Sequence, residues 1–161
     1  MPEANLWPIN DMWGLHDYGE GNGHPGYYTN AVNNRYGTAT NIEDFCLKAQ
    51  MVNIVNHKAM YEGYANILGN GNAVGLIMWM SNPAWPSLVW QTYDYYLETG
   101  GAFFGIKTAA EFLHIQWDSR NENVRVVNHL QNDYNNLTAE AWVYNMDGTL
   151  KYNNSVCVNA I

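Results

Sequence analysis

The amino-acid sequence predicts an α/β region that extends to about residue 111, followed by a region of β-strands. In the first region, apolar residues recur at helical spacing over residues 42–67 and then form an unbroken run from Val74 to Met80. A helix followed by a buried strand is half of a βαβ unit. From Phe112 onward the apolar residues alternate with polar ones, which is typical of half-buried strands.

Length and composition indicate a folded protein whose polar surface carries little charge. The 161 residues have the size of one ordinary domain and are 47% hydrophobic and 14% aromatic, which excludes a disordered chain. Only 14% are charged, and 23 asparagines supply much of the polarity. The net charge of −8, with seven lysines and arginines in all, argues against binding to nucleic acid or to an anionic membrane.

The cysteines and the apolar segments leave the compartment open. Cys46 and Cys157 are too few for a disulfide framework and have no metal-ligand neighbours, so we expect both to be small buried residues. We expect no signal peptide at the start of the chain. The longest apolar run, residues 73–80, is too short to span a membrane.

A long loop and then a long helix are expected in the first half of the chain. The first forty residues are rich in glycine, proline and aromatic residues, and a loop of that length is usually functional. Thr40 and Glu43 have the spacing of a capping box, in which a hydroxyl and a carboxylate satisfy N–H groups of the first helical turn. Gly69 is the expected helix end. The run from Val74 to Met80 then has the length of a parallel strand buried on both faces.

Shorter elements are expected after this strand. Residues 88–96 are predicted to form a short helix, residues 100–105 a glycine-rich loop, and residues 107–111 one or two helical turns. Four strands follow, the last two joined by a hairpin turn at Asp147-Gly148. Four strands in some fifty residues are about half of an immunoglobulin-like sandwich.

Known catalytic motifs are missing from the sequence. It has no nucleophile elbow, no phosphate-binding glycine loop and no His-Glu-x-x-His pair. His16, Asp17 and His24 have the chemistry of metal ligands, but a simpler interpretation is that they are hydrogen-bonded loop residues. We therefore expect no metal ion and no cofactor.

Two clusters of aromatic residues stand beside amides and carboxylates. One surrounds Trp7 and Trp13, and the other extends from Trp79 to Asp94. Sugars stack their apolar faces on such rings, while amides and carboxylates bind their hydroxyl groups. The alternative is that the tryptophans belong to the core. The place of Trp79 at the carboxyl end of the expected strand favours a site, because that end of a barrel strand faces the active site.

Two stretches of the sequence resemble glycoside hydrolase family 2. Residues 79–96 read WMSNPAWPSLVWQTYDYY, and with their continuation to Gln116 they are similar to the end of the catalytic barrel in exo-β-D-glucosaminidases and β-mannosidase-type enzymes. Residues 6–17 read LWPINDMWGLHD and resemble the segment that follows the seventh barrel strand. One departure is Phe112, where many relatives have proline.

The resemblance implies both a fold and an activity. Residues 1–111 would be the last βα part of a (β/α)8 TIM barrel, and residues 112–161 the first strands of an immunoglobulin-like β-sandwich. The enzyme would be a retaining, exo-acting β-glycosidase acting on β-glucosaminides or β-mannosides through two carboxylates. Both carboxylates would precede residue 1, so no residue of this chain is assigned a catalytic role and the chain alone is expected to be inactive.

The resemblance also implies one wall of a sugar site. Trp79 would lie beneath the sugar, between two loops. The expected substrate-binding residues on those loops are Asn82, Trp85 and Asp94 on one, and Asn10, Asp11, Trp13, His16 and Asp17 on the other. An acidic rim would suit a cationic glucosamine substrate. The alternative is a non-catalytic carbohydrate-binding or structural module.

The resemblance implies two kinds of partner. One is carbohydrate, and the other is either the remainder of a parent enzyme or a second copy of this chain bound through exposed strand edges. No nucleic acid or membrane partner is expected. Since such relatives are often exported, a parent enzyme would be periplasmic or secreted.

Overall fold

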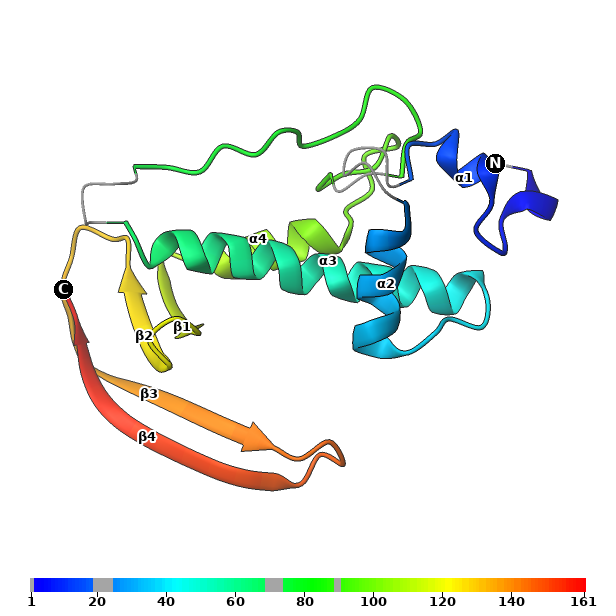
Figure 1. The fold of residues 1–161 in the computed structure, drawn as a ribbon. Helices are drawn as coiled ribbons and strands as arrows, with labels where there is room; N and C mark the ends of the chain where they lie inside the picture. The colour runs from blue at the N-terminus through cyan, green and yellow to red at the C-terminus, as the bar shows by residue number, and fades with distance from the viewer. Residues whose placement is uncertain (1, 19–24, 69–73, 89–90) are drawn as a thin grey trace. The chain divides into compact units, whose positions relative to one another are not determined.

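The computed structural model describes residues 2–18, 25–68, 74–88 and 91–161 (Figure 1). The chain divides into two compact units. Unit 1 consists of Met1–Tyr61 and Gly75–Thr108, and unit 2 of Glu62–Val74 and Ala109–Ile161. The division falls within a long helix, α3 (Ile42–Ala65), whose last turn belongs to unit 2. No helix in the described part of the chain is long and apolar enough to cross a membrane.

Unit 1 is built from helices and long connecting segments. Its elements are the 3-10 turn η1 (Glu3–Asn5), α1 (Asp11–Gly14), α2 (Pro25–Tyr36), most of α3, and α4 (Gly101–Ala109). The buried side chains of its core come from α1 and the turn after it, from α2 and from α3: Trp13, Tyr18, Val32, Phe45 and Val52. The first aromatic cluster of the sequence therefore builds much of this core.

Helix α2 occupies part of the first forty residues, where the sequence analysis predicted only a loop. That prediction was wrong because the segment is rich in residues of low helix propensity, and tertiary contacts outweigh propensity here. Val32 is fully buried, and the Tyr28 hydroxyl donates to the Ala49 carbonyl of α3 at 2.7 Å. Pro25 at the first helical position and Gly37 (φ 78°) after the last mark the ends, an asymmetry typical of helices.

The cap of α3 is Asn41, one residue later than predicted. Its side-chain oxygen accepts a hydrogen bond from the Asp44 N–H at 2.9 Å, and the Asp44 carboxylate accepts one from the Thr40 N–H at 3.0 Å. Asparagine is a stronger capping residue than threonine, so Asn41 and Asp44 take the place of Thr40 and Glu43. Hydrogen bonds from Lys48 and from the Thr40 backbone lower the pKa of the Asp44 carboxyl.

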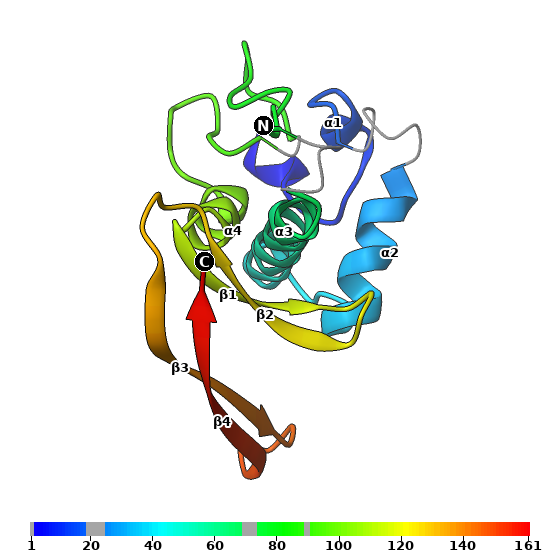
Figure 2. The ribbon, with the colours of Figure 1, turned by 90° about the vertical axis from the view of Figure 1, so that its left-hand side faces the viewer.

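Helix α4 begins at Gly101, inside the predicted glycine-rich loop. Figure 2 shows α3 and α4 side by side. A Cβ atom at Gly101 would overlap the Gln50 carbonyl oxygen of α3, and one at Gly105 would overlap the Ile54 carbonyl oxygen. The two glycines let the helix backbones approach closely, and this packing compensates for their poor helix propensity.

Residues 74–80 form no strand, contrary to the prediction. Val74 and Ile77 are 98% and 95% exposed. A parallel strand that is buried on both faces needs neighbouring strands for its hydrogen bonds and its burial. In the described ranges no strand pairs with this segment, and Val74 and Ile77 face solvent.

Unit 2 contains two antiparallel strand pairs, which confirms the four predicted strands. The strands β1 (Leu113–Asp118) and β2 (Asn123–Asn128) form one pair, and β3 (Tyr134–Tyr144) and β4 (Leu150–Ala160) form the other. The predicted hairpin turn is confirmed as well: Gly148 has a φ of 82°, and the Asp147 carboxylate accepts from the Thr149 N–H at 2.9 Å.

A buried polar network ties the last turn of α3 to β1 within unit 2. The Glu62 carboxylate lies 2.8 Å from Nε2 of His114, and both residues are buried. The Gln116 amide donates to the Glu62 carbonyl at 2.8 Å and to the Asn66 side-chain oxygen at 2.7 Å. Because buried polar groups are costly unless they are paired, these bonds fix the position of β1 against the helix end.

Both cysteines are free and exposed, so the prediction that they are buried was wrong. Cys157 pairs with Thr138 across β3 and β4, where a two-stranded sheet leaves its polar face to solvent. Cys46 lies next to the core residue Phe45 on α3 but points outward.

Candidate functional site

Two loops of unit 1, seventy residues apart in sequence, meet at His16 and Trp85. Nδ1 of His16 lies 2.6 Å from the Pro86 carbonyl oxygen, and since a carbonyl only accepts, this nitrogen donates. The imidazole stacks on the Trp85 indole, with centroids 5.7 Å apart and 19° between the planes. The Leu88 N–H donates to the His16 carbonyl at 2.7 Å. The structure therefore brings together two of the predicted site residues.

The loop around α1 uses several predicted site residues to hold itself in place. The side-chain oxygen of Asn10 caps α1 by accepting from the Met12 N–H at 2.9 Å. The Trp13 indole is only 5% exposed, packs edge-on against Phe45 and donates to the Leu6 carbonyl at 3.2 Å. These two side chains position the loop from within the protein.

The carboxylates of this loop are more accessible. Asp11 is exposed in the first turn of α1, where a negative charge is favoured by the helix dipole. Asp17 is partly exposed, directly after the histidine that stacks on Trp85, and its backbone has a φ of 62°.

The segment that carries Trp79 and Asn82 is anchored at Ser81. The Ser81 carbonyl accepts from the Thr92 hydroxyl at 2.8 Å and from the Tyr93 N–H at 2.9 Å. Thr92 is buried, whereas Trp79 is 83% exposed and Asn82 is exposed. The segment is thus fixed at its backbone and presents an indole and an amide to solvent.

Asp94 closes a short loop over residues 94–98. Its Oδ1 accepts from the Tyr96 N–H at 2.8 Å and from the Glu98 N–H at 2.9 Å. A backbone bridge joins Tyr93 and Thr99 at the base of the loop. The predicted helix over residues 88–96 is wrong for its described part, residues 88 and 91–96. The Asp94 side chain competes for the N–H groups that a helix would use. Residues 89 and 90 lie outside the described residues.

The supporting residues Ser81, Thr92 and Leu88 were missed by the sequence analysis. Ser81 and Thr92 are in contact although they lie 11 residues apart, and Leu88 contacts His16 of a different loop. No rule of sequence spacing connects such positions. The proline-flanked sequence around Trp85 is the signal nearest to them, since it indicates a rigid turn.

The segments that form this surface carry acidic residues and no lysine or arginine. Residues 2–18 contain Glu3, Asp11 and Asp17, and residues 75–106 contain Asp94 and Glu98. The seven basic residues all lie outside these two ranges. These two segments therefore carry a net negative charge, which would favour a cationic ligand.

A metal site has no support in the described part of the chain, where no three His, Cys, Asp or Glu side chains gather as a metal ion requires. His24, one of the three residues considered as ligands, lies outside the described residues.

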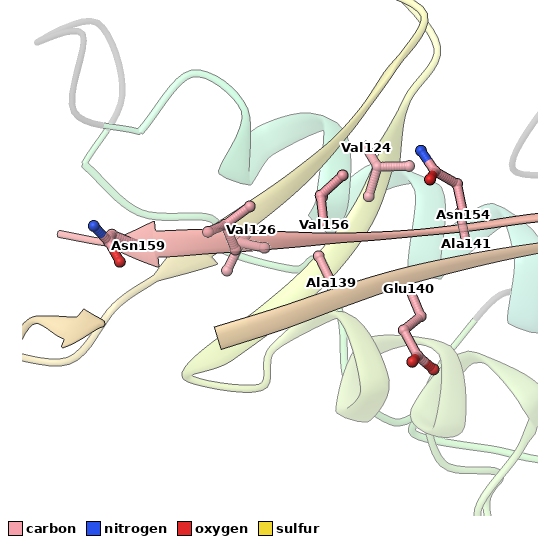
Figure 3. A pocket seen from close by; sticks show the side chains of 9 residues that line it. Val124, Val126, Ala139, Glu140, Ala141, Asn154, Val156 and Asn159 are labelled. Atoms are coloured by element: carbon pink, nitrogen blue, oxygen red, sulfur yellow. The ribbon is translucent and has the colours of Figure 1, made fainter. Parts of the chain in front are cut away.

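A hollow of about 280 Å³ in unit 2 differs from this surface in its chemistry (Figure 3). It lies between β2 and the β3–β4 pair and is lined mainly by aliphatic side chains: Val124, Val126, Ala139, Ala141, Val156 and Val158. Its polar lining residues are Glu140, Asn154 and Asn159, and the hollow marks the mainly apolar face of the β3–β4 sheet.

Comparison with known proteins points to one group of enzymes. No family model matches the chain. It is 42% identical over 130 residues to an exo-β-D-glucosaminidase of Amycolatopsis orientalis, an alignment that covers 80% of this chain and 13% of that enzyme. It is 33% identical over 117 residues to a mannosylglycoprotein endo-β-mannosidase of Lilium longiflorum, covering 73% of this chain and 12% of that protein.

Solved structures agree with these sequence matches. The crystal structure of the Amycolatopsis orientalis exo-chitosanase matches 99% of this chain and 20% of that chain, with a TM-score of 0.83 and 35% identity. A β-D-mannosidase of Dictyoglomus thermophilum matches with a TM-score of 0.77 and 16% identity, which shows a likeness of fold alone.

The fold and the sequence thus relate the chain to glycoside hydrolases. It is homologous to the exo-β-D-glucosaminidases and β-mannosidases of glycoside hydrolase family 2, which confirms the resemblance found in residues 6–17 and 79–96. The chain spans about 13% of the length of the exo-β-D-glucosaminidase that it matches.

Proposed function

We propose that this chain forms one wall of the sugar-binding site of a retaining, exo-acting β-glycosidase. The observation that carries the proposal is the 42% identity to the Amycolatopsis orientalis exo-β-D-glucosaminidase. A structure of the exo-chitosanase of that organism in complex with PNP-β-D-glucosamine matches 85% of this chain with a TM-score of 0.78. Residues 1–111 are assigned to the end of a TIM barrel and residues 112–161 to the first strands of an immunoglobulin-like sandwich.

The exposed apolar run of residues 74–80 supports the barrel assignment. Its side chains have the composition of a strand buried on both faces, yet Val74 and Ile77 are almost fully exposed. Neighbouring barrel strands would pair with this segment and cover the side chains of Val74 and Ile77. Trp79 would then stand at the carboxyl end of the strand, where barrel enzymes bind their substrates.

Each predicted site residue has a role in this assignment. Trp79 stacks beneath the sugar ring, and the Asn82 amide binds a hydroxyl group. Trp85, braced by His16, extends the aromatic surface. The carboxylates of Asp11 and Asp17 form an acidic rim, while Asn10, Trp13 and Asp94 hold the loops in position.

The bond-breaking chemistry is assigned to groups outside this chain. Retaining glycosidases use one carboxyl group as acid and base and a second as a nucleophile that forms a covalent glycosyl-enzyme. Residues of this chain bind and orient the sugar between them. An aromatic floor and a rigid rim hold the sugar in the geometry that the reaction needs, which is how positioning groups lower a barrier.

The charge pattern favours a glucosaminide over a mannoside. The two segments that form the wall carry only acidic charges, and a protonated 2-amino group would be attracted to them, whereas mannose is neutral.

Replacing Trp79 with alanine is expected to weaken binding of glucosamine disaccharide to the 161-residue chain by about tenfold, because the sugar loses its stacking surface. Isothermal titration calorimetry measures the affinity. Trp142→Ala is the matched control, since Trp142 is 51% exposed on β3 in unit 2 and should leave the affinity unchanged. Equal affinities of the Trp79→Ala and unsubstituted chains would contradict the assignment of Trp79, and no binding by the unsubstituted chain would leave only a structural module.

A further inference from the structure

We propose that the loop of residues 94–98 is a second sugar-contacting surface, which binds a β-linked glucosamine chain beyond the unit held by Trp79. Tyr96 is its main platform and Glu98 its charged partner. This inference rests on the proposed function of the wall and names its ligand as an oligomer.

The tip of the loop presents three consecutive large side chains to solvent. Tyr95, Tyr96 and Leu97 are 46%, 74% and 67% exposed. The two tyrosine rings meet edge to face, with centroids 5.2 Å apart and 82° between the planes, so each ring limits the motion of the other. Exposed aromatic side chains gathered at one place mark interaction sites, and a tyrosine offers both a ring face and a hydroxyl to a sugar.

The loop is held in one shape by its own hydrogen bonds. The Asp94 N–H donates to the Glu98 carbonyl at 3.0 Å, and the Leu97 N–H donates to the Asp94 carbonyl at 3.1 Å. The Asp94 carboxylate accepts from two further backbone N–H groups. A ring on such a loop loses little conformational freedom when it binds a ligand, which favours affinity.

The loop is continuous with the proposed wall. The N–H of Tyr93 donates at 2.9 Å to the carbonyl of Ser81, which lies two residues after Trp79 in the sequence. The Tyr93 ring packs against the ring of Phe103 on α4, with centroids 5.6 Å apart. An extended oligosaccharide that stacks one unit on Trp79 has further units that need support. The loop that follows Tyr93 supplies exposed rings for them.

The charge of the loop selects a cationic chain. Asp94 and Glu98 are both exposed, and no lysine or arginine occurs from residue 75 to residue 106. Each unit of a glucosamine oligomer carries an amino group, so several ammonium groups would lie near these carboxylates. A tip of three side chains is far smaller than the 20 to 30 residues a side of a typical protein interface, which favours a sugar over a protein partner.

The test is the dependence of affinity on oligomer length, measured by calorimetry on the 161-residue chain with glucosamine oligomers of one, two, four and six units. We expect affinity to rise from the dimer to the hexamer, and Tyr96→Ala to lower hexamer affinity by about fivefold while leaving monomer affinity unchanged. Tyr96→Phe keeps the ring and should retain most of the affinity. Tyr144→Ala, at a 56% exposed tyrosine on β3, is the matched control.

The outcomes separate this inference from the proposed function. If Trp79→Ala weakens monomer binding but Tyr96→Ala leaves the length dependence unchanged, the loop surface is refuted and the wall stands. If Trp79→Ala also leaves the affinity for the glucosamine monomer unchanged, both the loop surface and the proposed wall are refuted. An equal rise of affinity with length for neutral mannose oligomers would refute the role of charge. Dimerisation of the chain that depends on concentration and is lost in Tyr96→Ala would show that the tip of the loop binds a second copy of the chain instead of a sugar.

Discussion

Replacing Glu62 with alanine is expected to destabilise unit 2 by about 2 kcal/mol, because it leaves Nε2 of the buried His114 without its hydrogen-bond partner. Glu62 and His114 are both buried and 2.8 Å apart, on the last turn of α3 and on β1. Removing one member of a buried pair exposes the cost of burying the other, whereas the pair itself contributes little net stability. Hydrogen exchange at the amides of β1 and β2 measures the effect within unit 2.

The matched control is Glu111→Ala. The Glu111 carboxylate lies 3.7 Å from Nδ1 of the same histidine, but its side chain is 62% exposed. Solvent screens such a pair, so we expect a change of less than about 0.5 kcal/mol. Similar losses for Glu62→Ala and Glu111→Ala would show that burial does not set the importance of the Glu62 contact.

Replacing Gly105 with alanine is expected to destabilise unit 1 by about 2 to 3 kcal/mol, because the added methyl group would overlap the backbone of α3. The overlapping atom is the Ile54 carbonyl oxygen, which cannot rotate away as a flexible side chain would. The helices would have to separate and lose packing. Chemical unfolding followed by circular dichroism measures the loss.

Gly63→Ala tests whether the effect comes from packing or from glycine as such. Gly63 also lies in a helix, α3, but a Cβ atom there would meet nothing within 4 Å. Alanine has the higher helix propensity, so this substitution should stabilise the chain by up to about 1 kcal/mol. A stabilising effect of Gly105→Ala as well would contradict the close approach of α3 and α4.

The elements predicted correctly are those that local sequence pattern determines. Strands β1 to β3 follow from alternation of apolar and polar residues, and β4 follows from the hairpin turn that Asp147-Gly148 predicts. The α3 helix follows from its apolar spacing. Its cap was misplaced by one residue because Thr40 and Asn41 are both capping residues, and only the structure shows which of them is used.

The elements predicted wrongly depend on distant parts of the chain. Helix α2 forms because its side chains fill the core beside α3, although its residues favour other structures. Helix α4 includes two glycines that look like loop residues until the backbone of α3 is placed against them. Residues 74–80 have the composition of a strand, but a strand exists only beside partners.

In the candidate site too, local sequence pattern predicted some features, and others depend on contacts with distant parts of the chain. Aromatic and acidic residues identified the two loops, and the structure places His16 and Trp85 in contact. No sequence rule predicted that Trp13 would be buried in the core while Trp79 is exposed. The sequence also did not predict that Asn10 and Asp94 hold their loops by accepting backbone hydrogen bonds.

The most direct test of the proposed sugar-binding wall is hydrolysis by a chimera in which residues 1–161 replace the matching segment of the Amycolatopsis orientalis enzyme. We expect the chimera to hydrolyse PNP-β-D-glucosamine, Trp79→Ala to lower its kcat/KM by at least about tenfold, and Trp142→Ala to leave kcat/KM unchanged. The 161-residue chain alone should show no turnover. A folded chimera that neither binds nor hydrolyses the substrate, or one in which Trp79→Ala has no effect, would contradict the assignment of this chain to the sugar site.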